Sequence, residues 1–112
     1  MAEPTFYAYR IQPTRPAMLT EGLSSAELDS FQRHSAYLQK LVDEGVACFV
    51  GRTLNTDASV WATTIFKSDS EEAARAVMNG DPFVQDGVMR AELFPFRVVH
   101  IREANASLSS TP

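Results

Sequence analysis

Hydrophobic and polar residues alternate at the start of the chain and then change to a helical spacing. The run TFYAYRIQ, residues 5–12, alternates and is rich in aromatic residues, which predicts a β-strand ended by the nearby prolines. Ser24 stands three residues before Glu27, as in a capping box. From there to Gly45, apolar residues recur at the spacing of one helical face: Leu28, Phe31, Leu38, Leu41 and Val42. The first half of the chain is therefore predicted to contain a strand, a loop and a long amphipathic helix.

The second half of the chain repeats this order with shorter segments. VACFVG, residues 46–51, and SVWATTIF, residues 59–66, read as strands joined by a polar, hairpin-like connection. EEAARAVMN, residues 71–79, follows several serines and predicts a second helix, after which the sequence DPF forms a turn. Residues 88–101 predict a long final strand, in which Pro95 requires either a bulge or an edge position.

The element order β-α-β-β-α-β predicts an α+β fold of the ferredoxin-like type. In it, a four-stranded antiparallel sheet carries both helices on one face. Apolar residues nevertheless occupy both faces of the first strand, with Phe6 and Ala8 on one face and Tyr7, Tyr9 and Ile11 on the other. A face open to water should be more polar. We therefore expect a homodimer in which a second copy covers the free face of the sheet.

Length and composition indicate one globular domain. The 112 residues are too few for two domains, and 45% hydrophobic and 21% charged residues are ordinary for a folded chain. We expect the domain at residues 1–103 and a flexible tail at 104–112, which is small and polar. The net charge of −4, with scattered basic residues, argues against binding to nucleic acid or to an anionic membrane.

The cysteine and the start of the chain bear on location and redox chemistry. Cys48 has no partner for an internal disulfide and lies in an apolar run, which predicts a small core residue. Neither a signal peptide nor a membrane span is recognisable, so a cytoplasmic protein is expected. Two histidines and one cysteine on three elements do not have the spacing of a metal site, so no metal is predicted.

His34 is the residue that raises a question of chemistry. Counting about 100° per residue from Phe31, at the centre of the apolar stripe, places His34 about 60° to one side, at the margin of the buried face. Tyr37 lies further along that flank. The residues alone leave two readings open: a structural histidine bonded to the backbone, or a base whose second nitrogen opens into a cavity.

Asp81, in the segment GDPFVQDG at residues 80–87, is the second candidate. Because it precedes Pro82, it is biased towards an extended conformation, in which its carboxylate could cap the following turn. The alternative is a bond to the imidazole of His34, which would fix the tautomer and raise the basicity of the ring. Capping and catalysis are both compatible with the sequence.

The sequence resembles the YciI-related (YCII) family in an ordered set of residues and motifs. The set consists of His34, Leu38, Leu41, Gly45 and Gly51, then SxSEEA at 68–73, DPFVxxGV at 81–88 and PF at 95–96. The resemblance covers about residues 5–100. It implies a ferredoxin-like unit that dimerises through its sheet, and an active site made by His34 and Asp81. It also implies chemistry without a cofactor, such as elimination or isomerisation of a small, cyclic or carbonyl-bearing molecule. Some family members carry an arginine where this chain has Phe31.

Five further residues are predicted to contact a small-molecule ligand. Arg10 is a candidate for holding an anion, and Tyr7 or Tyr9 for donating a phenolic hydrogen bond; Tyr37 and Phe83 complete the set. The function predicted is thus that of a cofactor-free lyase or isomerase that uses a His and Asp pair. The alternative is a dimeric binding or accessory protein in which the pair is structural.

Overall fold

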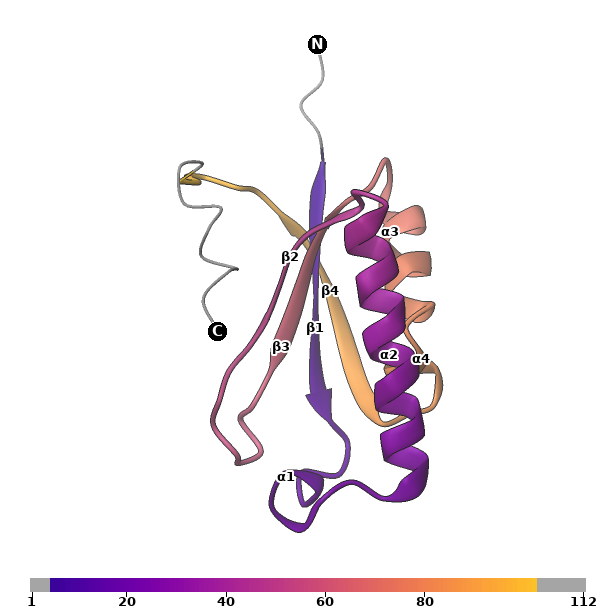
Figure 1. Cartoon of the computed structure of the whole chain (residues 1–112). Coiled ribbons are helices and arrows are strands. Elements are labelled where there is room, and N and C mark those ends of the chain that lie inside the picture. Colours follow the sequence, from indigo (N-terminus) through magenta and orange to yellow (C-terminus); the bar gives the residue numbers. More distant parts are fainter. Residues whose placement is uncertain (1–4, 103–112) are drawn as a thin grey trace.

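A four-stranded antiparallel sheet with helices on one face makes up the computed structural model, which describes residues 5–102 (Figure 1). The strands are β1 (Phe6–Pro13), β2 (Ala47–Arg52), β3 (Ala62–Lys67) and β4 (Met89–Phe96). The helices are α1 (Met18–Glu21), α2 (Ser25–Asp43), α3 (Glu71–Asn79) and α4 (Pro82–Gln85). The order β2-β3-β1-β4 brings the first and last strands together, and the predicted ferredoxin-like α+β fold is confirmed.

The core lies between the sheet and the two long helices, which Figure 1 shows on the same side of the strands. Tyr7, Tyr9 and Ile11 of β1 point into it, together with Phe66 of β3 and the buried positions of α3. Tyr9 packs edge-on against Phe66, with ring centroids 5.9 Å apart. Among the helices of residues 5–102, none combines the length and the apolar character that a membrane span needs.

The opposite face of the sheet also carries apolar side chains, as the alternation along β1 predicts. Ala8 pairs with Ile65 of β3 on one side and with Phe94 of β4 on the other. Arg10 reaches across this face, where its Nη2 binds Glu92 at 2.6 Å and its guanidinium lies 5.8 Å from the centre of the Phe94 ring. The long helices of the chain leave this face uncovered (Figure 1).

Two strands are shorter than predicted, each for a reason of hydrogen bonding. The strand expected from residue 59 begins at Ala62, because the N–H of Trp61 donates to the Thr53 hydroxyl at 3.0 Å instead of to its carbonyl. The strand expected to reach residue 101 ends at Phe96, which pairs with Phe6 at the very start of β1. Pro95 lies on this edge strand with no shift in register, so the predicted edge position is confirmed.

The prediction that Cys48 is a core residue is wrong. The pairing of β2 with β3 shifts register between Ala47 and Phe49, and Cys48 sits at this irregularity with an exposed side chain. Its thiol lies 3.2 Å from the carbonyl oxygen of Ile65. An apolar run predicts that a strand exists, but a bulge changes which of its residues face the core. The tail predicted at residues 104–112 lies outside the described residues.

The centre of the buried face of α2 also differs from the prediction. Phe31 is 43% exposed, whereas Ser30, His34 and Leu41 are buried. The cause is α4, a short helix in the segment predicted to be a turn, which packs on α2 where Ser30 donates to the Pro82 carbonyl at 3.4 Å. His34 is therefore inside the buried face rather than at its margin.

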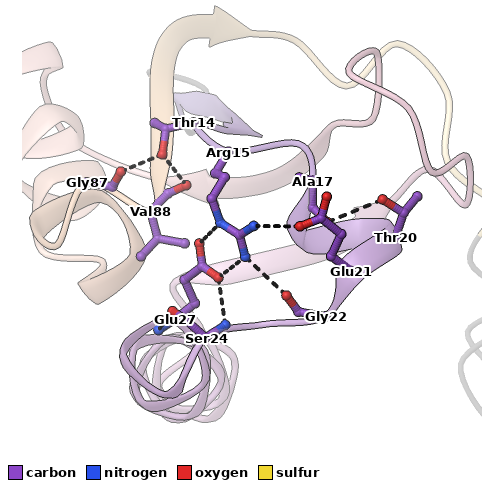
Figure 2. Close-up of polar contacts among 10 residues, drawn as sticks. All are labelled: Thr14, Arg15, Ala17, Thr20, Glu21, Gly22, Ser24, Glu27, Gly87 and Val88. Carbon is purple, nitrogen blue, oxygen red and sulfur yellow. Dashed lines mark hydrogen bonds and ion pairs between the residues drawn. The ribbon is translucent and has the colours of Figure 1, made fainter.

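A clamp around Arg15 fixes the connection between β1 and α2 (Figure 2). The Arg15 guanidinium donates to both oxygens of Glu27 at 2.8 and 2.6 Å and to the Gly22 carbonyl at 3.1 Å. Glu27 also accepts from the backbone N–H of Ser24, which completes the predicted capping box. The guanidinium of Arg15, and next the backbone bond from Ser24, lower the pKa of Glu27 to about 2. The start of α2, and hence the position of His34, is fixed by these contacts.

Candidate active site

His34 and Asp81 meet in the core between α2 and α4. The Nδ1 atom of His34 lies 2.8 Å from Oδ1 and 2.9 Å from Oδ2 of Asp81. His34 projects from the middle of α2, whereas Asp81 follows α3 and is the N-cap of α4. The contact predicted between these two residues is thus present in the structure, and it joins positions 47 residues apart.

Asp81 is fully buried, and three donors surround its carboxylate. Oδ1 accepts from the backbone N–H of Phe83 at 2.9 Å, Oδ2 accepts from the Tyr9 hydroxyl at 2.9 Å, and both oxygens face His34. The bond to Phe83 is the capping bond that the sequence suggested as an alternative to a catalytic role. The structure shows that one carboxylate makes both contacts, because its two oxygens point in different directions.

The hydrogen-bond pattern assigns the tautomer of His34. An ionised carboxylate can only accept, and both oxygens of Asp81 already accept from other groups, so Nδ1 of His34 carries the proton. In the neutral ring, Nε2 is then left with a free lone pair. The His34 side chain is 11% exposed. The hydrogen bonds of the His34 ring within residues 5–102 involve Nδ1 alone, so Nε2 has no hydrogen-bond partner there.

Aromatic rings line the position of His34. Phe83 stacks on the imidazole with ring centroids 4.1 Å apart and an interplanar angle of 24°. Phe31 lies 6.4 Å from the His34 ring and 5.9 Å from Phe83, and much of its surface is exposed. Although its place in the apolar stripe predicts a core residue, Phe31 is an exposed neighbour of the site. Its position three residues before His34, on the same helical face, was the signal that could have found it.

Two of the tyrosines predicted to contact a ligand have pKa values that the charge of Asp81 helps to raise. Tyr9 is 1% exposed; burial, and next the charge of Asp81, raise its pKa well above the ordinary range. Tyr37 donates its hydroxyl to the Val77 carbonyl at 2.6 Å, and burial, followed by the charge of Asp81, raises its pKa as well. Both hydroxyls therefore remain protonated at neutral pH and act here as donors.

The other predicted ligand-contacting residues lie apart from the pair. Tyr7 is buried in the core, where its ring centroid lies 6.3 Å from that of Phe66. Arg10 points to the opposite face of the sheet, because it follows Tyr9 directly in the strand. Arg33, adjacent to His34, is held on the surface by Asp29 and Asp86. Within one chain, the structure brings Tyr9, Tyr37 and Phe83 to the pair, but not Tyr7 or Arg10.

A groove of about 60 Å³ opens at the α1 end of the sheet. It is almost wholly apolar and is lined by Ile11, Pro13, Leu19, Arg52, Val60, Trp61, Ala62 and Met89. Neither His34 nor Asp81 lines it, so the substrate pocket beside the pair stays a prediction. Within residues 5–102, no three histidine, cysteine or acidic side chains gather closely enough to hold a metal ion.

Solved structures similar to this chain share its fold at low sequence identity. One is a 5-chloro-2-hydroxyhydroquinone dehydrochlorinase from Burkholderia phenoliruptrix, in complex with 2,5-dihydroxybenzoquinone. It has 20% identity and a TM-score of 0.57, and the match covers 87% of this chain and 97% of the other. Another is an uncharacterised protein of Thermotoga maritima with 12% identity and a TM-score of 0.55, covering 85% and 100% of the two chains.

The family is shown by the sequence itself. No curated protein matches the chain significantly. The model of the YCII-related domain, however, matches residues 6–97, which contain all four strands and both His34 and Asp81. This chain therefore belongs to the YCII-related domain family.

Proposed function

We propose that this protein is a cofactor-free acid/base enzyme in which Nε2 of His34 is the general base. The observation that carries the proposal is the pair of contacts, at 2.8 and 2.9 Å, between Nδ1 of His34 and the buried carboxylate of Asp81. Asp81 keeps the proton on Nδ1, orients the ring and stabilises the imidazolium that forms. A histidine with this support and an accessible Nε2 is suited to proton abstraction near neutral pH.

The reaction we propose is elimination or isomerisation of a small, cyclic or carbonyl-bearing molecule. Nε2 takes a proton from an acidic C–H or phenolic O–H. The electrons left behind either expel a leaving group as an anion, with a new double bond, or move the double bond before the proton returns to another carbon. No redox partner is needed for either outcome. The dehydrochlorinase with the same fold acts on a chlorinated hydroxyhydroquinone, which makes phenols of this kind the first substrates to test.

Loss of activity in matched histidine variants tests the role of His34. Wild type, His34→Ala, Asp81→Asn and His100→Gln would be screened against halogenated phenols, hydroquinones and small lactones. His100 is the other histidine of the chain and is exposed, so it serves as the control. We expect turnover by wild type and the His100 variant, and a loss of about 10²–10⁴ in kcat for the other two.

Two results would count against the proposal. Turnover that survives His34→Ala would remove His34 from the chemistry. Tight binding of these compounds, at wild-type affinity in His34→Ala and without turnover by any form, would favour the binding or accessory protein that the sequence also allowed.

We also propose that the protein is a homodimer formed through the open face of the sheet. Exposed aromatic residues gather there on the outer strands, Phe49 on β2 and Phe94 and Phe96 on β4. An apolar face of this kind is typical of an interface. Sedimentation or light scattering should give twice the chain mass of 12.4 kDa. Phe94→Glu should shift the measured mass towards that of the monomer. A wild-type protein that is monomeric at micromolar concentration would contradict the proposal.

A further inference from the structure

We propose that Tyr9 is a positioning residue of this site, whose buried hydroxyl holds Oδ2 of Asp81 and thereby sets the orientation and proton affinity of His34. The inference rests on the proposed roles of His34 and Asp81 and adds a residue from a third element. The sequence suggested Tyr9 as a ligand contact. The structure instead places its hydroxyl 2.9 Å from Oδ2, inside the core.

Geometry separates Tyr9 from a substrate contact. The residue is 1% exposed, and its one hydroxyl proton is directed at Asp81 rather than at the surface beside Phe31. Its ring is fixed on the other side by Phe66, whose centroid is 5.9 Å away. A side chain packed this tightly cannot turn towards a ligand without breaking its bond to the carboxylate. It can, however, hold that carboxylate still.

The direction of the effect on His34 follows from charge. Each donor to Asp81 spreads and stabilises its negative charge, so less of that charge is left to favour the imidazolium. Tyr9 is one of three donors, beside the Phe83 N–H and His34 itself. Removing the hydroxyl of Tyr9 should therefore make Asp81 a stronger partner and raise the proton affinity of His34.

The surroundings contain few groups that compete with this effect. Tyr37, one helical turn beyond His34, also interacts electrostatically with Asp81. Thr64 of β3, which pairs with Tyr9 across the strands, hydrogen-bonds its side chain and partly counteracts the rise in the pKa of Tyr9. Arg33 of α2 and Asp86 at the end of α4 are bound to each other at the surface.

The test is an NMR titration of His34 in Tyr9→Phe and in a matched control, Tyr7→Phe. Tyr7 lies on the same strand and face and is also buried, but it makes no hydrogen bond to Asp81. His100, assigned with a His100→Gln variant, gives an internal reference. We expect the titration midpoint of His34 to rise by about 0.5–1 pH unit in Tyr9→Phe and to stay unchanged in Tyr7→Phe.

A purely structural role for Tyr9 predicts another result. Tyr9→Phe would then lower stability while the midpoint of His34 stayed within about 0.2 pH unit of wild type, and the inference would be overturned. If Tyr9→Phe does not fold, 3-fluorotyrosine at position 9 provides the test. Its more acidic hydroxyl is a stronger donor, so the midpoint should fall, and a rise or no change would overturn the inference. None of these readouts requires turnover, so they are independent of whether a substrate is found.

Discussion

Replacing Asp81 with alanine should destabilise the protein far more than replacing an ordinary aspartate. The change removes the acceptor of three buried donors: the Tyr9 hydroxyl, the Phe83 N–H and Nδ1 of His34. A buried donor left without an acceptor costs about 1–3 kcal/mol, and the loss of an N-cap costs about 1 kcal/mol. With the cap bond to Phe83 at about 1 kcal/mol and the other two donors at about 1–3 kcal/mol each, the three together reach about 3–7 kcal/mol. The variant no longer buries a carboxylate, which offsets part of this, so we expect a loss of about 3 kcal/mol.

Urea unfolding, followed by the fluorescence of Trp61 and by circular dichroism, gives the free energy of unfolding. Asp86→Ala is the matched control, because Asp86 ends the same short helix but is exposed and binds Arg33 at the surface. It should cost much less, since exposed ion pairs contribute little. Asp81→Asn should fall between the two, because the amide oxygen can still accept from Phe83. Equal losses in Asp81→Ala and Asp86→Ala would refute the reasoning, since they would mean that the three buried bonds contribute nothing.

Three further predictions concern other parts of the molecule. The pKa of Glu27 is lowered from 4.5 to about 2, so the contribution of its carboxylate to stability is complete above pH 4.5 and is lost as the pH falls towards 2. In Glu27→Gln, the fall in the free energy of unfolding over this pH range should be smaller than in wild type. An equal fall in both proteins would contradict the clamp with Arg15. Gly80→Ala should cost about 1–3 kcal/mol in urea unfolding, because its Cβ would lie 2.7 Å from the Tyr37 hydroxyl, and the cost should shrink in a Tyr37→Phe background. Because its side chain is exposed, Cys48 should react with a thiol reagent in the absence of denaturant. Reaction only after unfolding would show instead that Cys48 is buried.

The elements of the fold could be predicted because their signals are local. The capping box at Ser24 and Glu27 and the apolar spacing that follows are contained within α2, and both are present in the structure. The helix predicted at residues 71–79 has the same bounds as α3. Signals of this kind need only neighbouring residues, so one sequence is enough to read them.

The buried face of α2 could not be predicted from its own periodicity. Phe31 fits the apolar stripe, yet it is exposed, because the short helix α4 packs over Ser30 and His34 instead. Periodicity shows which residues share a face of a helix, but the tertiary partners decide how that face is centred. The same holds for Cys48, whose exposure depends on a register shift against β3.

From the residues, the contact between His34 and Asp81 was one of two alternatives, and the family resemblance favoured it. From the residues, Asp81 could equally have been a cap, and the structure shows that it is a cap as well as a partner of His34. Nothing in the sequence indicated the bond from Tyr9, because it depends on the pairing of β1 with β3 and β4 and on the packing of α4 beneath it.

The carboxylate of Asp81 joins parts of the chain that are synthesised far apart, and this links the site to the order of folding. Its bond to Tyr9 closes a separation of 72 residues, and its bond to His34 closes one of 47. A partly folded chain, with α2 formed but β1 not yet paired, has the imidazole but not the arrangement around it. Because closing such loops has an entropic cost, we expect this junction to form late in folding. The amide proton of Phe83 should accordingly exchange with solvent only through global unfolding.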